Sequence, residues 1–505
     1  MYTFSSKLKT LSLVLMVLGI LGIGYGFLTA PKNIEEVEKI LADEARDGHH
    51  GGGHADAGHE AHEAHEMPAV TPASPEAEEA HHTAAVTEAT AEASDSLTVP
   101  ADSTHTTVAV PAETHNAAPM HKEKVVDEHA EHQKHVEHVF HQLQNKPWAA
   151  LYVSCIFILL ISLGVLAFYA LQQVAQAGWS PVLFRVMQGI TAYLPVGSVI
   201  FFILLIFAGL HFHHMFPWLT EGVTDPKSAE YDHMIAGKSG YLNFPFWIIR
   251  AAIFLGGWNL YRYYSRKNCL AQDESIDDSF YKKNFKMSAG FLVFFLVTES
   301  IMSWDWIMSV DPHWFSTLFG WYVLMSFLVS AVTTIALVTL YLKSKGYLEY
   351  VNTSHIHDLA KFMFGFSVFW TYLWFSQFML IWYANIPEEV TYFITRIENY
   401  NLPFFGMVVM NFVFPILILI NTDFKRLTWI VVMAGTIILL GHYVDFFNMI
   451  MPATVGDRWF IGVPEIGSLF FFIGLFIFVV FTALTKSPLL AKRNPFIEES
   501  KHFHY

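Results

Sequence analysis

Cysteine and charge are both scarce in this chain. Its two cysteines, Cys155 and Cys269, belong to separate segments, with neither a C-x-x-C nor a C-x-x-C-H motif. This excludes the sequence patterns by which iron–sulfur clusters and covalently attached haem are recognised. Only 15% of the residues are Asp, Glu, Lys or Arg, whereas soluble domains carry about 25%. The low charge argues against a water-soluble protein, and the formal net charge of -15 disfavours a nucleic-acid partner.

Apolar and aromatic residues are abundant instead. Hydrophobic residues make up 53% of the chain, which contains 45 Phe, 21 Tyr and 14 Trp, a composition typical of lipid-facing helices and interfacial belts. A helix needs about 20 apolar residues to cross a bilayer. Ten runs qualify, so the sequence predicts an all-α membrane protein with ten transmembrane helices. The predicted spans are 11–30, 148–171, 189–210, 244–264, 287–310, 317–342, 360–384, 402–420, 428–449 and 465–485.

Basic residues predict the orientation of these spans. The N-terminus, the even-numbered loops and the C-terminus together hold 18 Lys and Arg, whereas the odd-numbered loops, apart from the long first loop, hold four. Cytoplasmic loops carry the excess of basic residues, so both termini are expected in the cytoplasm. We interpret the first span as an uncleaved anchor, because its apolar stretch exceeds the usual length of about 7–15 residues in a signal peptide.

A polar insertion at 31–146 separates the first two spans. It is rich in Ala, Glu, His and Thr and has almost no aromatic residue before Phe140, so it cannot bury a core and is expected to be a mostly disordered extracytoplasmic loop. Only its end is expected to be helical, where it leads into the second span at Pro147. The insertion holds 16 of the 26 histidines. Histidines recur every three residues at His59, His62 and His65, and at His129, His132, His135, His138 and His141. A soluble spacer is favoured over metal binding or proton buffering.

Two short motifs recur at matching positions. The stretch N-F-P-F-W at 243–247 opens the fourth span, and N-L-P-F-F at 401–405 opens the eighth. Asp305 in the fifth span and Asp445 in the ninth are each followed by an aromatic residue and, seven residues after the acid, by proline. Copies four spans apart have the same orientation, so spans two to five and six to nine are predicted to form two parallel four-helix bundles. The predicted parts are the anchor 1–30, the histidine-rich loop 31–146, the first bundle 147–315, the second bundle 316–452, and the last span with its cytoplasmic tail, 453–505.

The stretch 303–322, SWDWIMSVDPHWFSTLFGWY, combined with ten spans and two four-helix units, resembles a known family. This family comprises the quinol-interacting membrane subunits of the polysulfide-reductase (NrfD-like) type. Within it the chain is most similar to the two paralogous integral subunits of bacterial alternative complex III, over about residues 147–490. The histidine-rich insertion after a first anchor span resembles the second of these paralogues, the F subunit.

This resemblance implies a subunit of a respiratory quinol:cytochrome c, or oxidase-coupled, oxidoreductase in the bacterial inner membrane, supporting quinol oxidation and proton translocation. It leaves open whether this chain is itself catalytic. The implied haem c and iron–sulfur clusters belong to partner subunits, and menaquinone or another quinone is the one cofactor implied near this chain. The implied partners are the paralogous ten-span subunit, multihaem cytochrome c subunits, an iron–sulfur subunit, a terminal oxidase and membrane lipids.

Ionisable residues at membrane depth are costly and therefore rank as functional candidates. Glu299 lies near the middle of the fifth span, with Asp305 six residues further out. His442 and Asp445 lie three residues apart and hence on one face of the ninth span. Arg250 lies in the outer half of the fourth. We interpret these residues as proton-handling candidates, although Asp305 and Asp445 are equally explained as groups that cap or cross-link the repeats.

A second group lies at the predicted outer mouth of the bundles and is a candidate quinone pocket. Its members are His214, Asp311, His313 and Glu388. For the acids and His313, helix capping or contact with water is the favoured alternative. His211, His213 and His214 end the third span without a partner histidine at mid-membrane, which argues against haem ligation.

Two other functions remain open from the sequence. A secondary transporter also has repeats and buried acids, but transporters typically break helices at the midplane, often in inverted repeats. Here the paired prolines lie at span ends and the repeats are parallel. The third possibility is a purely structural scaffold in which the acids have no chemical role.

The basic-residue count generates a test of topology. Protease added to sealed, right-side-out spheroplasts is expected to cut the 31–146 loop, because the loop lies outside when both termini are cytoplasmic. Immunoblotting against tags at the two termini measures the cut, and protection of the loop would reverse the predicted orientation.

Overall fold

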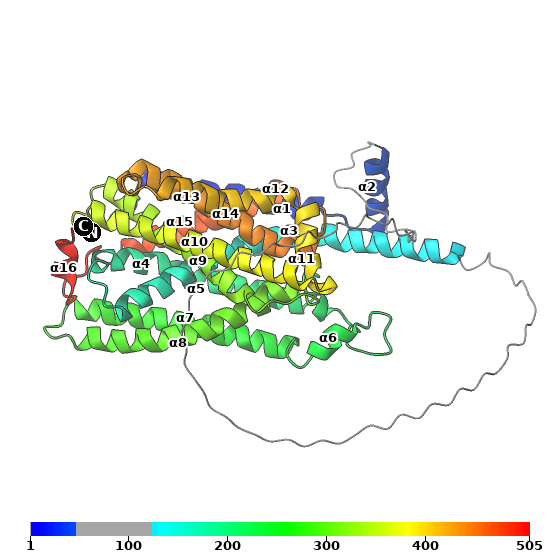
Figure 1. Ribbon diagram of the computed structural model, residues 1–505, viewed down its shortest axis with the longest axis horizontal. Helices are drawn as coiled ribbons and strands as arrows, with labels where there is room; N and C mark the ends of the chain where they lie inside the picture. Colours follow the sequence, from blue (N-terminus) through cyan, green and yellow to red (C-terminus); the bar gives the residue numbers. More distant parts are fainter. Residues whose placement is uncertain (1, 47–123, 505) are drawn as a thin grey trace, which may run out of the picture. The chain divides into compact units, whose positions relative to one another are not determined.

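The computed structural model of the chain describes residues 2–46 and 124–504. In this part the protein is built from helices and has no strand (Figure 1). Nine helical segments of these residues are long and apolar enough to cross a membrane, which indicates a multi-pass membrane protein. The helices that enter the argument below are α1 (Ser6–Thr29), α2 (Ile34–Arg46), α3 (Lys124–Val174), α4 (Phe184–Ile190), α5 (Leu194–Gly209), α6 (His233–Lys238), α7 (Phe244–Gln272), α8 (Ser279–Trp306), α9 (Phe319–Ser344), α10 (Thr353–Ala384), α11 (Pro387–Glu398), α12 (Asn401–Val408), α13 (Phe414–Leu419), α14 (Thr428–Val455), α15 (Val463–Leu484) and α16 (Ile497–Lys501).

The predicted fourth span is the one predicted span that is not apolar enough to be counted among these nine segments. It coincides with α7, whose 29 residues are ample to cross a bilayer. Arg250 interrupts its apolar residues and lowers the mean hydropathy of the helix. α7 nevertheless packs along α8 and against α5 (Figure 1), so it belongs to the same group of helices as its sequence neighbours. The other nine predicted spans coincide with the nine apolar segments.

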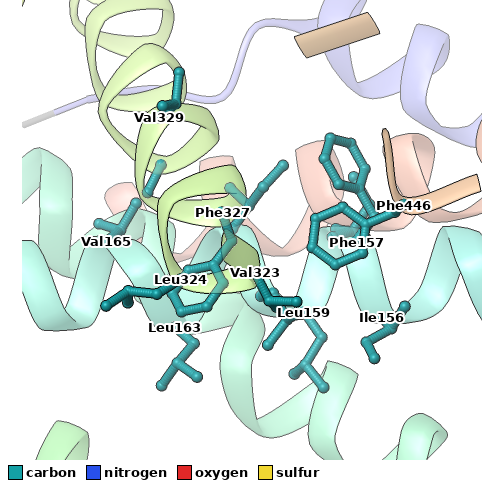
Figure 2. Packing of buried hydrophobic residues seen from close by; sticks show 14 of the residues in the cluster. Ile156, Phe157, Leu159, Leu163, Val165, Val323, Leu324, Phe327, Val329 and Phe446 are labelled. Carbon is teal, nitrogen blue, oxygen red and sulfur yellow. The ribbon is translucent and has the colours of Figure 1, made fainter. Parts of the chain in front are cut away.

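The centre of the protein is the contact between α3 and α9. The apolar part of α3 and nearly all of α9 are buried inside the protein rather than facing its surface. Figure 2 shows Phe157 and Leu163 of α3 interlocked with Val323 and Phe327 of α9. A Cβ added at Gly164 would lie 3.0 Å from the carbonyl oxygen of Phe327, so glycine lets the two backbones approach closely. The first helices of the two predicted bundles therefore pack directly against each other.

α1 packs lengthwise on α15, through glycine on both helices. A Cβ at Gly22 would lie 2.8 Å from the Cα of Gly467, and one at Gly467 would lie 2.7 Å from the Cα of Gly22. A Cβ at Gly19 would lie 2.5 Å from the backbone nitrogen of Phe471 on α15. In lipid, helices associate mainly through such close van der Waals packing, because the lipid tails are as apolar as the side chains.

The two ends of the histidine-rich insertion are ordered helices. The insertion was expected to be mostly disordered, and within it residues 34–46 form α2. Val37 of this helix packs against Val136 and Val139 of α3 and is itself fully buried. Arg458, after α14, donates two hydrogen bonds to the carboxylate of Glu44, at 2.7 and 3.0 Å. α3 begins at Lys124, in agreement with the predicted helical end. Residues 47–123, with the histidines from His59 to His65, lie outside the described residues.

The glycine contact predicts a position-specific loss of stability. Gly22→Val is expected to lower the thermal stability of the purified protein by several degrees, since overpacking a tight contact costs about 1–3 kcal/mol. Gly24→Val is the matched control, because a Cβ at Gly24 meets nothing within 4 Å. Equal melting temperatures for the two variants would contradict the close α1–α15 contact.

Candidate functional site

Two buried aspartates occupy the matching positions of the repeat. Asp305 lies next to the last residue of α8, whereas Asp445 lies ten residues before the end of α14. Both side chains have no exposed surface. In the first copy of the motif, α8 ends at Trp306 and Pro312 lies in the loop that follows. In the second copy, α14 continues through Pro452. The repeated motif thus produces two different local structures, and the partners of the two acids differ as well.

Asp305 forms an ion pair with Arg250 of α7. The guanidinium donates from Nε to Oδ2 at 2.7 Å and from Nη2 to Oδ1 at 2.9 Å. The same group donates to the carbonyl oxygen of Tyr241 at 3.1 Å, and its carbon lies 4.0 Å from the centre of the Tyr241 ring. Trp247 fixes the end of α8 by donating its indole N–H to the carbonyl oxygen of Asp305 at 2.9 Å.

This geometry favours a structural role for the pair. In the two-pronged contact, each group supplies the counter-charge that the other needs in a low-dielectric environment. Arg250 also ties α7 to α8. Between the two alternatives left open by the sequence, the contacts of Asp305 support cross-linking over proton exchange.

Among the residues that the structure describes, no arginine or lysine is bonded to Asp445. Its carboxylate accepts hydrogen bonds from the hydroxyl groups of Tyr322 and Ser326, the latter at 2.8 Å. The indole N–H of Trp370 donates to it at 2.9 Å, and Nδ1 of His442 lies 3.2 Å away. The four partners come from α9, α10 and α14. We call Asp445 with these four residues the Asp445 cluster.

The unusual backbone of the eighth span serves this cluster. Five residues, Val409–Val413, form a π-helical turn between α12 and α13, and such turns often occur at functional sites. The turn contains Asn411, which is fully buried and whose amide lies 3.5 Å from Nδ1 of His442. A Cβ at Gly441 would overlap Asn411, so glycine at this position lets α14 approach the turn. Nε2 of His442 and Oδ1 of Asn411 have no hydrogen-bond partner among the described residues.

A small cavity adjoins the cluster through Tyr322. Its volume of about 10 Å³ suits roughly one water molecule. Tyr322, Arg396 and Asn448 contribute polar groups to its lining. Arg396 is buried although it belongs to α11, and it donates from Nε to the carbonyl oxygen of Asn448 at 3.0 Å. The guanidinium carbon also lies 3.3 Å from the centre of the Tyr392 ring. Because Arg396 and Tyr322 line the same small cavity, Arg396 supplies a positive charge near Tyr322.

Glu299 is buried without a cation. Its exposed fraction is 1%, and its carboxyl group accepts hydrogen bonds only from Ser303 at 3.2 Å and Ser300 at 3.3 Å on its own helix. Hydroxyl groups solvate a carboxylate weakly compared with an ion pair. Of the three predicted acids at membrane depth, Asp305 has an arginine partner, whereas Glu299 and Asp445 have no lysine or arginine within 4.0 Å among the described residues.

The mouth candidates do not converge on one pocket. His313 is exposed and its Nε2 lies 2.6 Å from the carboxylate of Asp232. Asp232 caps α6, and the backbone N–H of Ile235, assisted by His313, holds the pKa of this carboxyl below its usual range. Asp311 is half-buried at the turn after α8, and Glu388 is exposed in the first turn of α11. His313 and Glu388 thus have the solvated or helix-terminal positions that the sequence offered as the alternative for this group.

The histidines after α5 also have local roles. The backbone N–H of His214 donates to Oδ1 of Asn145 at 2.9 Å, and its ring packs edge-on against His141. His213 is buried against Trp148, and burial lowers the pKa of its imidazole to about 4. His213 is therefore neutral at physiological pH and belongs to the packing of this end of the bundle.

Several residues of the Asp445 cluster were missed from the sequence. The sequence patterns considered above single out neither Trp370 nor Tyr322 nor Ser326. Ser326 and Tyr322 lie one helical turn apart on α9, and a search for hydroxyl groups at four-residue spacing opposite a buried acid would have found them. Arg396 was counted only as a loop residue, because nothing in its neighbourhood of the sequence indicates that α11 folds inward.

Comparison of the chain with protein-family models gives no match, and comparison with curated proteins gives none either.

The Arg250–Asp305 pair predicts strong non-additivity. Arg250→Met is expected to destabilise the protein by about 3–5 kcal/mol, because it leaves a buried carboxylate unpaired. The double variant Arg250→Met with Asp305→Leu should recover most of that loss, since two apolar side chains need no counter-charge. Thermal unfolding in detergent measures the cycle, with the exposed Lys282→Met as control. Losses that simply add would show that the two residues are not coupled.

Proposed function

We propose that this chain is an integral membrane subunit of a respiratory quinol:electron-acceptor oxidoreductase and that it contributes proton handling through the Asp445 cluster. Its redox partners and quinone follow from the sequence resemblance and remain part of the proposal. The observation that carries the proton-handling role is the buried Asp445 carboxylate, whose contacts are hydroxyl, indole and imidazole groups in place of a fixed cation.

These contacts are suited to proton exchange. A carboxylate paired with arginine is tied to a fixed counter-charge, whereas Asp445 is bonded to hydroxyl and imidazole groups that can themselves both donate and accept hydrogen bonds. His442 adjoins Asp445 at 3.2 Å and can accept or return a proton through its imidazole ring. Its free Nε2 leaves one ring nitrogen available for a second partner, such as water.

Tyr322 links the cluster to the cavity near Arg396. Its hydroxyl donates to Asp445 and also lines the cavity, so a water molecule there would connect the carboxylate to the α11 end of the protein. We expect Arg396 to favour the arrival of negative charge and to hinder the passage of free cations along this route. The direction from Asp445 towards α11 matches the outward bias predicted for the acids.

A series of hydroxyl groups extends the other way along α9. Ser330 and Thr334 are buried, and each donates to the carbonyl oxygen four residues earlier, at 2.8 Å in both cases. Ser326, which donates to Asp445, lies one helical turn before Ser330. Their lone pairs remain able to accept a hydrogen bond. This polar stripe runs from the Asp445 cluster towards the end of α9 that carries basic residues.

Replacement of Asp445 tests the proposal. Asp445→Asn keeps the size of the side chain and can still accept from Tyr322, but it cannot exchange a proton near neutral pH. In the assembled complex we expect normal assembly, with quinol oxidation or its coupled proton release slowed about tenfold or more. Turnover with a quinol analogue and pH-indicator measurements in proteoliposomes give the two rates.

Two further variants sharpen this test. Asp423→Asn removes an exposed acid and serves as the control for expression and assembly. Glu299→Gln examines the inner acid in the same assay and is expected to slow the same step. Wild-type turnover and proton yield in an assembled Asp445→Asn complex would leave the scaffold function, and solute uptake by proteoliposomes that contain this chain alone would favour a transporter.

A further inference from the structure

A second, much larger cavity lies along the C-terminal half of α9. It has a volume of about 360 Å³ and is bounded by α1, α3, α9, α14 and α15. The lining is almost entirely apolar, with residues such as Phe157, Leu337, Leu469, Ile473 and Phe481. Leu440 also lines it and is 49% exposed, so the pocket opens sideways onto the surface that faces lipid.

The length of this pocket matches one leaflet of a bilayer. Along α15 the lining extends from Leu469 to Phe481, which corresponds to about 18 Å of helix. One leaflet of the hydrocarbon core is about 15 Å thick. The pocket therefore suits a single extended hydrocarbon chain that enters at one membrane surface and ends near the midplane.

Aromatic residues mark the end of the pocket at the membrane surface. Tyr341 and Phe481 both line it there, with their ring centres 5.2 Å apart. The N-terminal segment closes over the same end, since Tyr2 and Phe4 stack on Phe481 with ring centres 5.9 and 6.0 Å away. Leu8 of α1 completes this mouth.

Four exposed lysines surround the mouth. Lys7 and Lys9 flank Leu8, Lys345 lies with its Nζ 5.8 Å from the centre of the Tyr341 ring, and Lys486 follows the end of α15. None of them has a carboxylate within 4.0 Å in the described part of the chain. This end of the pocket thus carries positive charge that the protein itself leaves uncompensated.

We propose that the pocket and these lysines form a binding site for one anionic phospholipid, with an acyl chain in the pocket and the phosphate at the lysines. The apolar lining accounts for the chain, and the lysines account for the anionic headgroup. The site is separate from the Asp445 cluster and does not depend on its function. A bound lipid would fill the space between α1 with α15 on one side and α9 with α14 on the other.

The experiment uses the full-length protein purified in mild detergent with any partners that accompany it. Native mass spectrometry counts retained phospholipid, and transfer into nanodiscs of phosphatidylglycerol or phosphatidylcholine measures the preference by thermal stability. We expect about one anionic phospholipid retained per chain and a higher melting temperature in phosphatidylglycerol.

Charge and shape are then removed separately. Replacing Lys7, Lys345 and Lys486 by Gln should weaken the preference for anionic lipid by about fivefold for each lysine. The matched control replaces Lys282, Lys283 and Lys286 of α8 by Gln, because α8 does not line the pocket. Ile473→Trp should fill the pocket and abolish retention of lipid of either charge.

Three results would overturn the proposal. The first is equal lipid retention by wild type, the lysine variant and Ile473→Trp, and the second is equal loss in the lysine variant and its α8 control. The third is an extract in which the molecule lost on Ile473→Trp is a quinone, whose isoprenoid tail would then occupy the pocket.

Discussion

An ionisable side chain inside a membrane protein is stable only where the fold supplies its partner. Lipid offers no such partner, and each buried charge without a partner costs on the order of several kcal/mol. This constraint governs which helices pair in the present structure. Arg250 requires α7 to lie against Asp305 of α8, and Asp445 requires hydroxyl and indole donors from α9 and α10.

The two solutions differ in what they leave possible. The Arg250–Asp305 pair satisfies both charges at once and so behaves as a fixed link between helices. The Asp445 cluster surrounds a carboxylate with two hydroxyl groups, an indole and an imidazole, and no lysine or arginine belongs to it. The two matching positions of the repeated motif thus hold buried acids with different partners: an arginine for Asp305, and hydroxyl, indole and imidazole groups for Asp445.

Close packing by glycine supports these contacts. Gly164 brings α3 against α9, and Gly441 brings α14 against the π-helical turn that holds Asn411. The α1–α15 pair uses the same device at Gly22 and Gly467. The apolar pocket described above lies between the α1–α15 pair and the helices α3, α9 and α14.

The sequence alone determined the membrane class, the position of nearly every long helix and the existence of two buried acids at matching positions. Hydropathy and motif spacing are local properties of the chain, so they can be recognised without the fold. The ordered helix α2 was missed because its apolar residues, such as Val37, gain their stability from α3, which is almost a hundred residues away in the chain. Only the tertiary structure decided the partners of Asp305 and Asp445, since residues on α7, α9 and α10 meet them through packing that sequence spacing does not encode. It also revealed the inward position of Arg396 and the lipid-facing pocket, both of which depend on how helices distant in sequence diverge and converge.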